Sequence, residues 1–258
     1  DTVWDALTGI STNTTVVTGL APSTAYDFRI KAVCSATDSS VWSNIFSEAT
    51  LCGAVSLPFF ENFSSATFPS NCWERMDGDL TTGSGTTVST GWVRITNSYG
   101  LDDAHAKLNI YGTARDHSLI TPEIDLGSTP GAELTFDLAL TDYNNGDTIE
   151  TDKDTYDDKF MVIISNDGGA TWSQANATIW SDDTTISANY SFRGISASGE
   201  HVTIDLSQYY GDTIKIAFYG ESTVSGGDND LHIDNILVQS ACPAPVITDV
   251  TPDATTAT

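Results

Sequence analysis

The sequence has few positive charges. Lys and Arg together number 10 against 35 Asp and Glu, which gives a formal net charge of -25 over 258 residues. This balance argues strongly against a nucleic-acid partner, because phosphate binding needs a basic surface. It also disfavours an anionic membrane surface, and no apolar run reaches the roughly eighteen residues that a spanning helix needs. An acidic surface instead keeps a protein soluble and attracts divalent cations.

Recognisable catalytic signatures are also lacking. The sequence contains no H-E-x-x-H, no G-x-S-x-G and no phosphate-binding loop. A Ser-His-Asp triad stays open in principle, because such triads are recognised in space rather than in sequence. With 35 carboxylates, a glycosidase-like pair could always be nominated, so nominating one carries no information. We therefore expect no enzymatic activity. The four histidines lie far apart in sequence: His105, His117, His201 and His232.

No segment has the periodicity of an amphipathic helix. Short, mostly alternating apolar runs such as "FMVIIS", "TIKIAFYG" and "LHIDNILV" are instead separated by Gly, Asn and Asp. Alternation of this kind is typical of half-buried β-strands, and the separating residues favour turns. Many short strands at such spacing predict an all-β chain of sandwich or barrel type.

The stretch "SNDGGATW" at 165–172 matches the Asp-box that sialidases carry several times. Here it occurs once, whereas a propeller repeats its blades at a fixed spacing, and the few arginines show no arrangement suited to a substrate carboxylate. The stretch lies between two apolar runs, and Asp-Gly-Gly favours a turn with positive φ at the glycines. We therefore interpret it as a structural turn, with Trp172 packing back onto the hairpin.

The N-terminal region contains the pattern Leu-x-Pro-x-Thr-x-Tyr, which ends at Tyr26. It resembles the tyrosine corner of fibronectin type III modules, in which the Tyr hydroxyl ties the turn to upstream backbone. Strands are predicted over 26–34 and about 45–51. Residues 1–51 make up roughly half of such a sandwich, so we expect it to be completed by a further segment or a neighbouring molecule. Residues 242–258 resemble the opening strand of another such module.

Four stretches of the central region are similar to one class of module. They are "CGAVSLPFFENFSSATFPSNCW", "DHSLITPEIDL", "DDKFMVIISNDGGATWS" and "LHIDNILV", in that order. Residues 52–241 thereby resemble the jelly-roll modules called cleaved-adhesin or MAM-like domains, found in gingipain-type and other surface proteins of Bacteroidetes. The resemblance implies an all-β jelly-roll β-sandwich, preceded by part of a fibronectin type III-like sandwich.

The same resemblance implies a function. It points to a non-catalytic secreted or cell-surface adhesion module of a larger multidomain protein, flanked by neighbouring modules of the same chain. Its ligand would be a glycan or a host or cell-surface protein; the alternative is a structural spacer attached to a secreted protease or glycosidase. Jelly rolls bind sugars through exposed aromatic platforms, but the sequence does not assign the ligand-binding residues. Aromatic residues near predicted loops or strand ends are Trp92, Tyr99, Tyr143, Tyr156, Trp180 and Tyr190.

The four cysteines show no C-x-x-C spacing typical of zinc or redox sites. Cys34 and Cys52 are expected at opposite ends of adjacent strands, about 25 Å apart, whereas a disulfide needs Cα atoms within about 7 Å. Cys52 and Cys72 bracket the first strand of the central module, and the MAM-like pattern pairs the equivalent positions. Cys34 and Cys242 are expected to lack partners within their own modules.

The acidic residues predict a bound Ca²⁺ ion that stabilises the jelly roll. Ca²⁺ takes roughly six to eight oxygen ligands, and carboxylates from distant segments can share one ion. The first and last strands of a jelly roll usually lie side by side, which would bring Glu61 near Asp234 and make them repel unless a cation lies between them. Both also match the acidic positions of the family's entry and exit strands. Asp103 and Asp77 are expected to supply further oxygens.

Overall fold

The computed structural model describes residues 4–83, 85–96, 99–113, 115–128, 131–149 and 157–241. The module start expected at 242–258 lies outside these described residues. The chain divides into two compact units, Asp1–Gly53 and Ala54–Thr258. The described residues include no helix that is both long and apolar enough to cross a membrane.

The first unit contains two short antiparallel pairs. β1 (Ala25–Phe28) pairs with β4 (Phe46–Ala49), and β2 (Val33–Ser35) pairs with β3 (Asp38–Ser39). The tyrosine corner is present, because the Tyr26 hydroxyl accepts a 2.9 Å hydrogen bond from the backbone N–H of Ala21. The strand predicted over 26–34 is divided between β1 and β2. None of the described residues of this unit is buried, so its apolar side chains form no core of their own.

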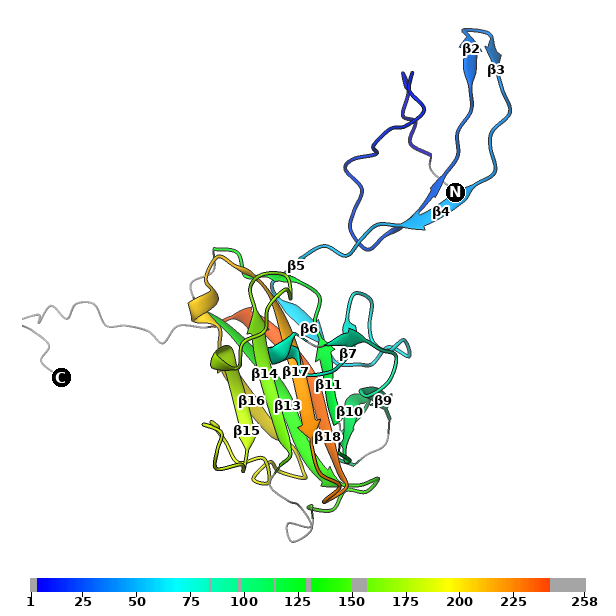
Figure 1. The fold of residues 1–258 in the computed structure, drawn as a ribbon. Helices are drawn as coiled ribbons and strands as arrows, with labels where there is room; N and C mark the ends of the chain where they lie inside the picture. The colour runs from blue at the N-terminus through cyan, green and yellow to red at the C-terminus, as the bar shows by residue number, and fades with distance from the viewer. Residues whose placement is uncertain are drawn as a thin grey trace, which may run out of the picture. The chain divides into compact units, whose positions relative to one another are not determined.

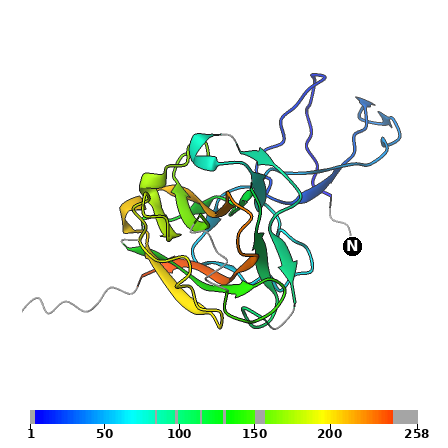
Figure 2. The ribbon, with the colours of Figure 1, turned by 60° about the horizontal axis from the view of Figure 1, so that its bottom comes forward.

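The second unit is built from two sheets that face each other (Figures 1 and 2). The six-stranded sheet contains, in spatial order, β16 (Glu200–Asp205), β13 (Ala132–Asp142), β18 (Asn229–Ser240), β10 (His105–Ile110) and β9 (Val93–Ile95), with β6 (Phe59–Glu61) also paired to β18. The eight-stranded sheet contains β15 (Ala177–Ser181), β14 (Lys159–Ser165), β17 (Thr213–Ser222), β11 (Arg115–Ile120), β7 (Glu74–Asp77) and β8 (Thr86–Thr87), with β12 (Ile124–Asp125) joining β17 to β5 (Val55–Ser56).

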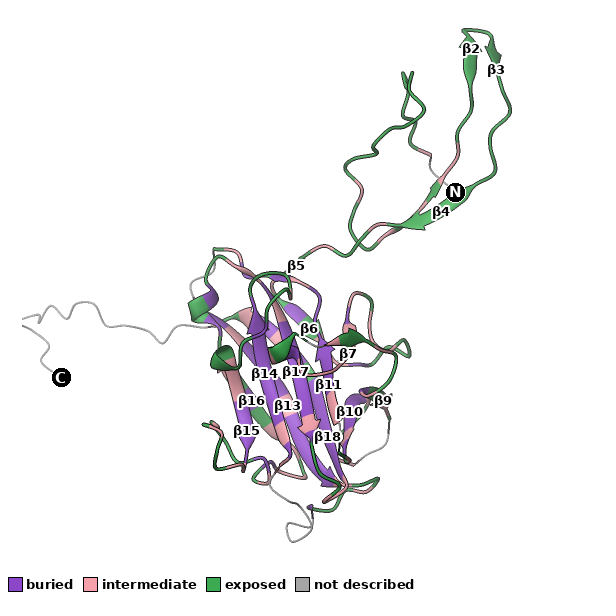
Figure 3. Ribbon diagram, viewed as in Figure 1, coloured by how far each residue is buried: buried purple, intermediate pink, exposed green. Residues whose placement is uncertain are grey.

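The main core lies between these sheets and is built from alternate residues of the long strands. Figure 3 shows that the long strands are mostly buried. The ring of Phe136, on β13, lies 5.4 Å from that of Phe218 on β17 and 6.3 Å from that of Phe160 on β14. All three side chains are fully buried. This edge-to-face contact across the sheets is the packing expected of a sandwich, and the predicted all-β sandwich class is confirmed.

A second apolar cluster covers the outer face of the eight-stranded sheet. On β14, Val162 and Ile164 belong to the main core, while Met161 and Ile163 belong to this outer cluster. Loops and short 3-10 helices supply the cover: η1 (Leu80–Thr82) contributes Leu80, and Trp172 precedes η2 (Gln174–Asn176). A third short helix, η3 (Ser207–Tyr209), places Tyr209 in the main core. The outer face of this sheet is therefore closed with apolar side chains.

The Asp-box stretch is a turn after β14, as predicted. Asp167 accepts hydrogen bonds from the Ser165 hydroxyl (2.6 Å) and from the backbone N–H (3.0 Å) and hydroxyl (2.6 Å) of Thr171. Gly168 and Gly169 have φ values of 74° and 88°, which only glycine adopts without strain. Trp172 packs on the outer apolar cluster. These hydrogen bonds hold the pKa of Asp167 well below its usual range.

Substitution of Asp167 by Asn should lower the melting temperature at pH 7 by a few degrees, because the charged acceptor of three hydrogen bonds is lost. The depressed pKa means that the unfolded state takes up a proton before the folded state does. The difference from wild type should therefore be complete above the ordinary pKa of 3.8 and shrink as the pH falls below it. Melting curves from pH 7 to pH 2.5 measure this, and a pH-independent difference would contradict it.

Candidate functional site

The candidate site lies where β18 exchanges one neighbouring strand for another. Along the same edge, residues 229–233 of β18 pair with β10 and residues 236–238 pair with β6, so neither strand reaches Asp234 and Asn235. On the other edge, the register with β13 shifts, so that Phe136 lies opposite both Asn235 and Ile236. Asn235 has a positive φ of 49°. Alternation from the core residue Ile233 places Asp234 on the outer face, and there it lies beside the bulge, at a break in the sheet edge.

A pocket of about 660 Å³ opens at this break, a volume within the range of small-ligand sites. Its walls come from the segment after β6, the loop that leads into β10, strand β13, the start of β16 and the bulge of β18. The polar side chains that line it are Asn62, Ser64, Asp102, Asp103, Asp137, Ser198, Glu200, His201, Asp234 and Asn235.

Asp234 is the most unusual group in the pocket wall. The residue is only 4% exposed, and its Oδ1 atom has no hydrogen-bond partner among the described residues. Burial raises the pKa of this carboxyl to about 7, and repulsion from Asp137, Asp103 and Glu61 adds to the effect. Burying a carboxylate charge without a positively charged partner costs free energy. This position therefore favours a bound proton or a bound cation.

The neighbouring acidic groups are partly held by other contacts. Asp137 accepts hydrogen bonds from His201 Nδ1 and Asn235 Nδ2, each at 2.8 Å. Glu61 Oε1 accepts one from the Phe63 backbone N–H at 2.7 Å. Asp103 lies in an exposed loop at a positive φ of 62°. As they stand, no three His, Cys, Asp or Glu side chains of the described residues are close enough to form a ready-made metal site.

The structure brings three of the four predicted calcium ligands toward one another. β6 and β18 are paired, with Glu61 opposite Ile236, so the expected proximity of the entry and exit strands is confirmed. Asp103 lines the same pocket as Asp234. Asp77 does not belong with them. It ends β7 in the other sheet, opposite His117, with its Oδ1 atom 3.3 Å from His117 Nδ1. We therefore remove it from the set.

Among the pocket members that were not predicted are Asp137 and His201. Asp137 lies between core residues in "TFDLA", and alternation alone places it on the outer face of its strand. Only the pairing of β13 with β18 puts it opposite Asp234, and only the pairing with β16 puts it opposite His201. No motif marks these contacts in the sequence.

Cys52 and Cys72 are disulfide-bonded, as the resemblance implied. Cys34 is exposed and free, and Cys242 lies outside the described residues.

The aromatic candidates separate clearly by burial. Trp92 and Trp180 are core residues with 0% and 2% exposure. Tyr190 and Tyr143 are 54% and 48% exposed, and Tyr190 stacks on Trp180 at 5.1 Å. Tyr99 is half-buried, and Tyr156 lies outside the described residues. Of these candidates, Tyr143 and Tyr190 therefore keep exposed ring surface, and Tyr99 lies at a loop edge.

No protein-family model and no curated protein matches the sequence. Among solved structures, the chain is similar to the K1 cleaved adhesin domain of Lys-gingipain from Porphyromonas gingivalis W83, with 19% identity and a TM-score of 0.44 over 72% of this chain and 99% of that one. It is also similar to the K2 cleaved adhesin domain (17% identity, TM-score 0.42, 70% and 99% covered). A family 11 carbohydrate-binding module of a Clostridium thermocellum cellulase is a third (11%, 0.38, 73% and 97%). Cleaved adhesin domains, to which the sequence motifs are similar, are thus among the structures that this chain resembles.

Substitution of Asp234 by Asn should stabilise the metal-free protein at pH 8 by a few degrees in melting temperature, because it removes a buried, unpaired charge. With the folded-state pKa raised to about 7, the folded state keeps its proton after the unfolded state has lost it, so this group costs stability as the pH rises from 3.8 to 7. The gain should therefore nearly vanish at pH 4. Melting curves in EDTA test this, with Asp77→Asn as the matched control; a gain that is equal at pH 4 and pH 8 would be evidence against it.

Proposed function

We propose that the second unit is a non-catalytic, extracellular binding module for a glycan or a protein, stabilised by Ca²⁺ in the acidic pocket. The observation that carries the calcium site is Asp234, a buried carboxylate whose Oδ1 has no hydrogen-bond partner among the described residues. It lines a pocket together with Asp103 and Asp137, and these two carboxylates and the nearby Glu61 repel it. A cation would convert this repulsion into attraction.

The donor set suits calcium better than softer metals. The pocket offers carboxylate, amide and hydroxyl oxygens, which Ca²⁺ prefers, and no cysteine lines it. Asp234 and Asp137 face each other on paired strands, while Glu61 and Asp103 belong to chain segments outside that ladder. Because the carboxylates are not yet gathered around one point, binding has to draw the latter two inward. That ordering has an entropic cost, so we expect affinity in the range of extracellular modules, about 10⁻⁴–10⁻³ M.

Asp137 and His201 in the same pocket are arranged like part of a catalytic triad. Asp137 orients His201 through Nδ1 at 2.8 Å, which is two thirds of a catalytic triad. The third part would be a hydroxyl held by the histidine, and Ser64 and Ser198 both line the pocket. Among the hydrogen bonds of the described residues, none joins either serine to His201; Ser198 instead contacts Ser196.

Calcium at about 10 mM should raise the melting temperature of EDTA-treated protein. For a site of the expected affinity the stabilisation is about 2 kcal/mol, or roughly 4–8 °C for a domain of this size. Asp234→Asn and Glu61→Gln should abolish the shift, and Asp77→Asn should keep it. Coincident curves in calcium and EDTA, with no metal found by elemental analysis, would remove calcium from the proposal.

Ligand binding needs its own measurement. Fluorescently labelled protein applied to a printed glycan array in calcium should give saturable signals on a limited set of glycans. A blank array together with a calcium-dependent melting temperature would leave a calcium-stabilised spacer or a protein-binding module.

A further inference from the structure

The outer face of the six-stranded sheet is closed in a different way from that of its partner sheet. On β10, Ala106, Leu108 and Ile110 belong to the core, so the residues between them point outward. On β18, Leu231 and Ile233 belong to the core and His232 points outward. These outward side chains are polar and yet buried: His105, Lys107, Thr141, Asp230 and His232 are each at most 8% exposed.

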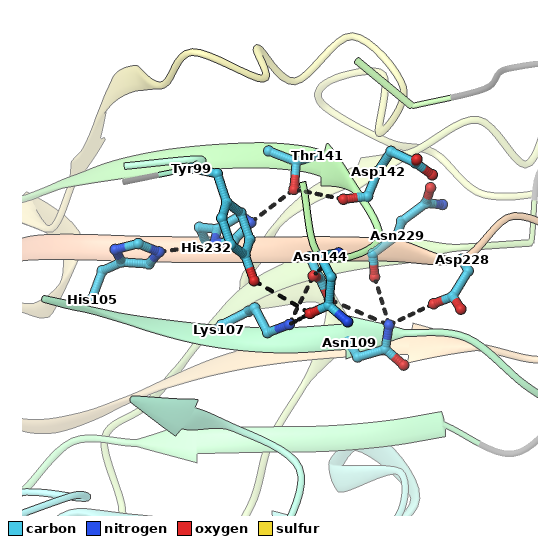
Figure 4. A network of polar contacts seen from close by, with 11 residues as sticks. Tyr99, His105, Lys107, Asn109, Thr141, Asp142, Asn144, Asp228, Asn229 and His232 are labelled. Carbon is cyan, nitrogen blue, oxygen red and sulfur yellow. Dashed lines mark hydrogen bonds and ion pairs between the residues drawn. The ribbon is translucent and has the colours of Figure 1, made fainter. Parts of the chain in front are cut away.

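Lys107 is the centre of this polar network (Figure 4). Its Nζ atom lies 2.7 Å from Asp230 Oδ2 and donates to Asn144 Oδ1 at 3.2 Å. Asp230 Oδ2 also accepts from the Asn144 backbone N–H at 2.9 Å, and its Oδ1 accepts from Asn109 at 3.3 Å. The ion pair thus fixes the loop that follows β13 to strands β10 and β18.

The histidines continue the network toward the loop that enters β10. His105 Nε2 lies 2.9 Å from His232 Nδ1, and His232 Nε2 lies 3.0 Å from the Thr141 hydroxyl. Burial lowers the pKa of both histidines. Gly100 covers His232 so closely that a Cβ atom would lie 2.6 Å from its ring. The preceding Tyr99 meets the His232 ring edge-on at 5.7 Å.

A buried ion pair is a poor way to gain stability, because its desolvation cost often exceeds its attraction. The eight-stranded sheet shows that an apolar cluster can close an outer face of this same molecule. Hydrogen bonds, unlike apolar contacts, are directional. Here the bonds of Lys107 and Asp230 to Asn144 fix the loop that follows β13 in one geometry. The groups fixed at its edge are two tyrosines, whose ring centres lie 6.0 Å (Tyr99) and 5.6 Å (Tyr143) from Lys107 Nζ.

We propose that Tyr143 and Tyr99, whose rings both lie near Lys107 Nζ, form a sugar-stacking platform for the glycan ligand, and that Lys107 is the residue that positions them. The proposal rests on the proposed function as a glycan-binding module. Tyr143 is 48% exposed, and Lys107 lies within cation–π distance of both rings. The C–H face of a pyranose ring can stack on an aromatic face held in this way.

Polar groups suited to sugar hydroxyls lie at the same end of the sheet. Tyr143 directly follows Asp142, whose register partner on β18 is Asn229. Asn109 Nδ2 donates to Asp228 Oδ1 at 2.7 Å, and both residues remain partly exposed. A binding site for one pyranose unit needs one or two aromatic rings for stacking and a few amide or carboxylate groups for its hydroxyls. A stable protein interface instead needs roughly 800 Å² from each partner around an apolar centre, so this small, polar-edged platform favours a glycan.

The test measures affinity for the glycan that gives the strongest array signal, by isothermal titration calorimetry in calcium. Tyr143→Ala should weaken binding at least about tenfold, while Tyr143→Phe, which keeps the ring, should stay within about threefold. Tyr190→Ala is the matched control, because Tyr190 is also a tyrosine with an exposed ring but lies beside β15, the edge strand of the other sheet. Its affinity should equal that of wild type.

Lys107 is tested by the double variant Lys107→Met/Asp230→Asn, which removes both charges and keeps an acceptor for the Asn144 N–H. Its melting temperature should stay within a few degrees of wild type, while glycan affinity should fall several-fold because the tyrosines are no longer held. Unchanged affinity in this variant would overturn the role of Lys107.

Affinity of Tyr143→Ala within twofold of wild type, or an equal loss in Tyr190→Ala, would overturn the platform. A blank array would overturn the whole inference. The calcium site is tested separately, by the melting curves in calcium and in EDTA.

Discussion

The hydrogen-bonded position of β18 is the constraint from which both sites follow. This strand pairs with β13 along one edge and with β10 and then β6 along the other. Where β10 and β6 fail to meet, Asp234 is left in a break of the ladder beside a bulge. His232 and Asp230 lie two and four residues before Asp234 on the same face of β18. Asp230 contacts the loop that follows β13, and His232 is covered by the loop that precedes β10. A single strand thus carries an acidic pocket and a neutralised polar network on the same face.

The difference between these two regions is a matter of charge balance. In the network, the Asp230 carboxylate is paired with Lys107 at 2.7 Å, and the buried histidines have lowered pKa values, so they stay neutral. In the pocket, Asp234 has no cation among its contacts and its pKa is raised. Only ten Lys and Arg accompany 35 Asp and Glu in this chain, so most carboxylates rely on solvation, and the buried Asp234 is largely withheld from solvent. A divalent ion is the counter-charge that an oxygen-lined pocket favours.

The two outer faces of the sandwich show how the same fold can be closed for different purposes. Met161, Ile163 and Trp172 cover one face with apolar contacts, which are non-directional. On the other face hydrogen bonds from Lys107 and to Asp230 fix Asn144 in the loop that follows β13, next to Tyr143. Apolar contacts of the first kind contribute stability without fixing one geometry, whereas hydrogen bonds of the second kind fix direction.

By itself, the sequence determined the strand class, the tyrosine corner, the Asp-box turn and the proximity of Glu61 to Asp234. These depend on local alternation, on turn chemistry or on the pairing of entry and exit strands that recognisable motifs mark. It did not determine the placement of Asp77, nor the addition of Asp137 and His201 to the pocket. Those depend on which strands pair and in which register, and a shift of one residue moves a side chain to the opposite face. The buried network was decided only by the tertiary structure, because its members come from segments up to 127 residues apart.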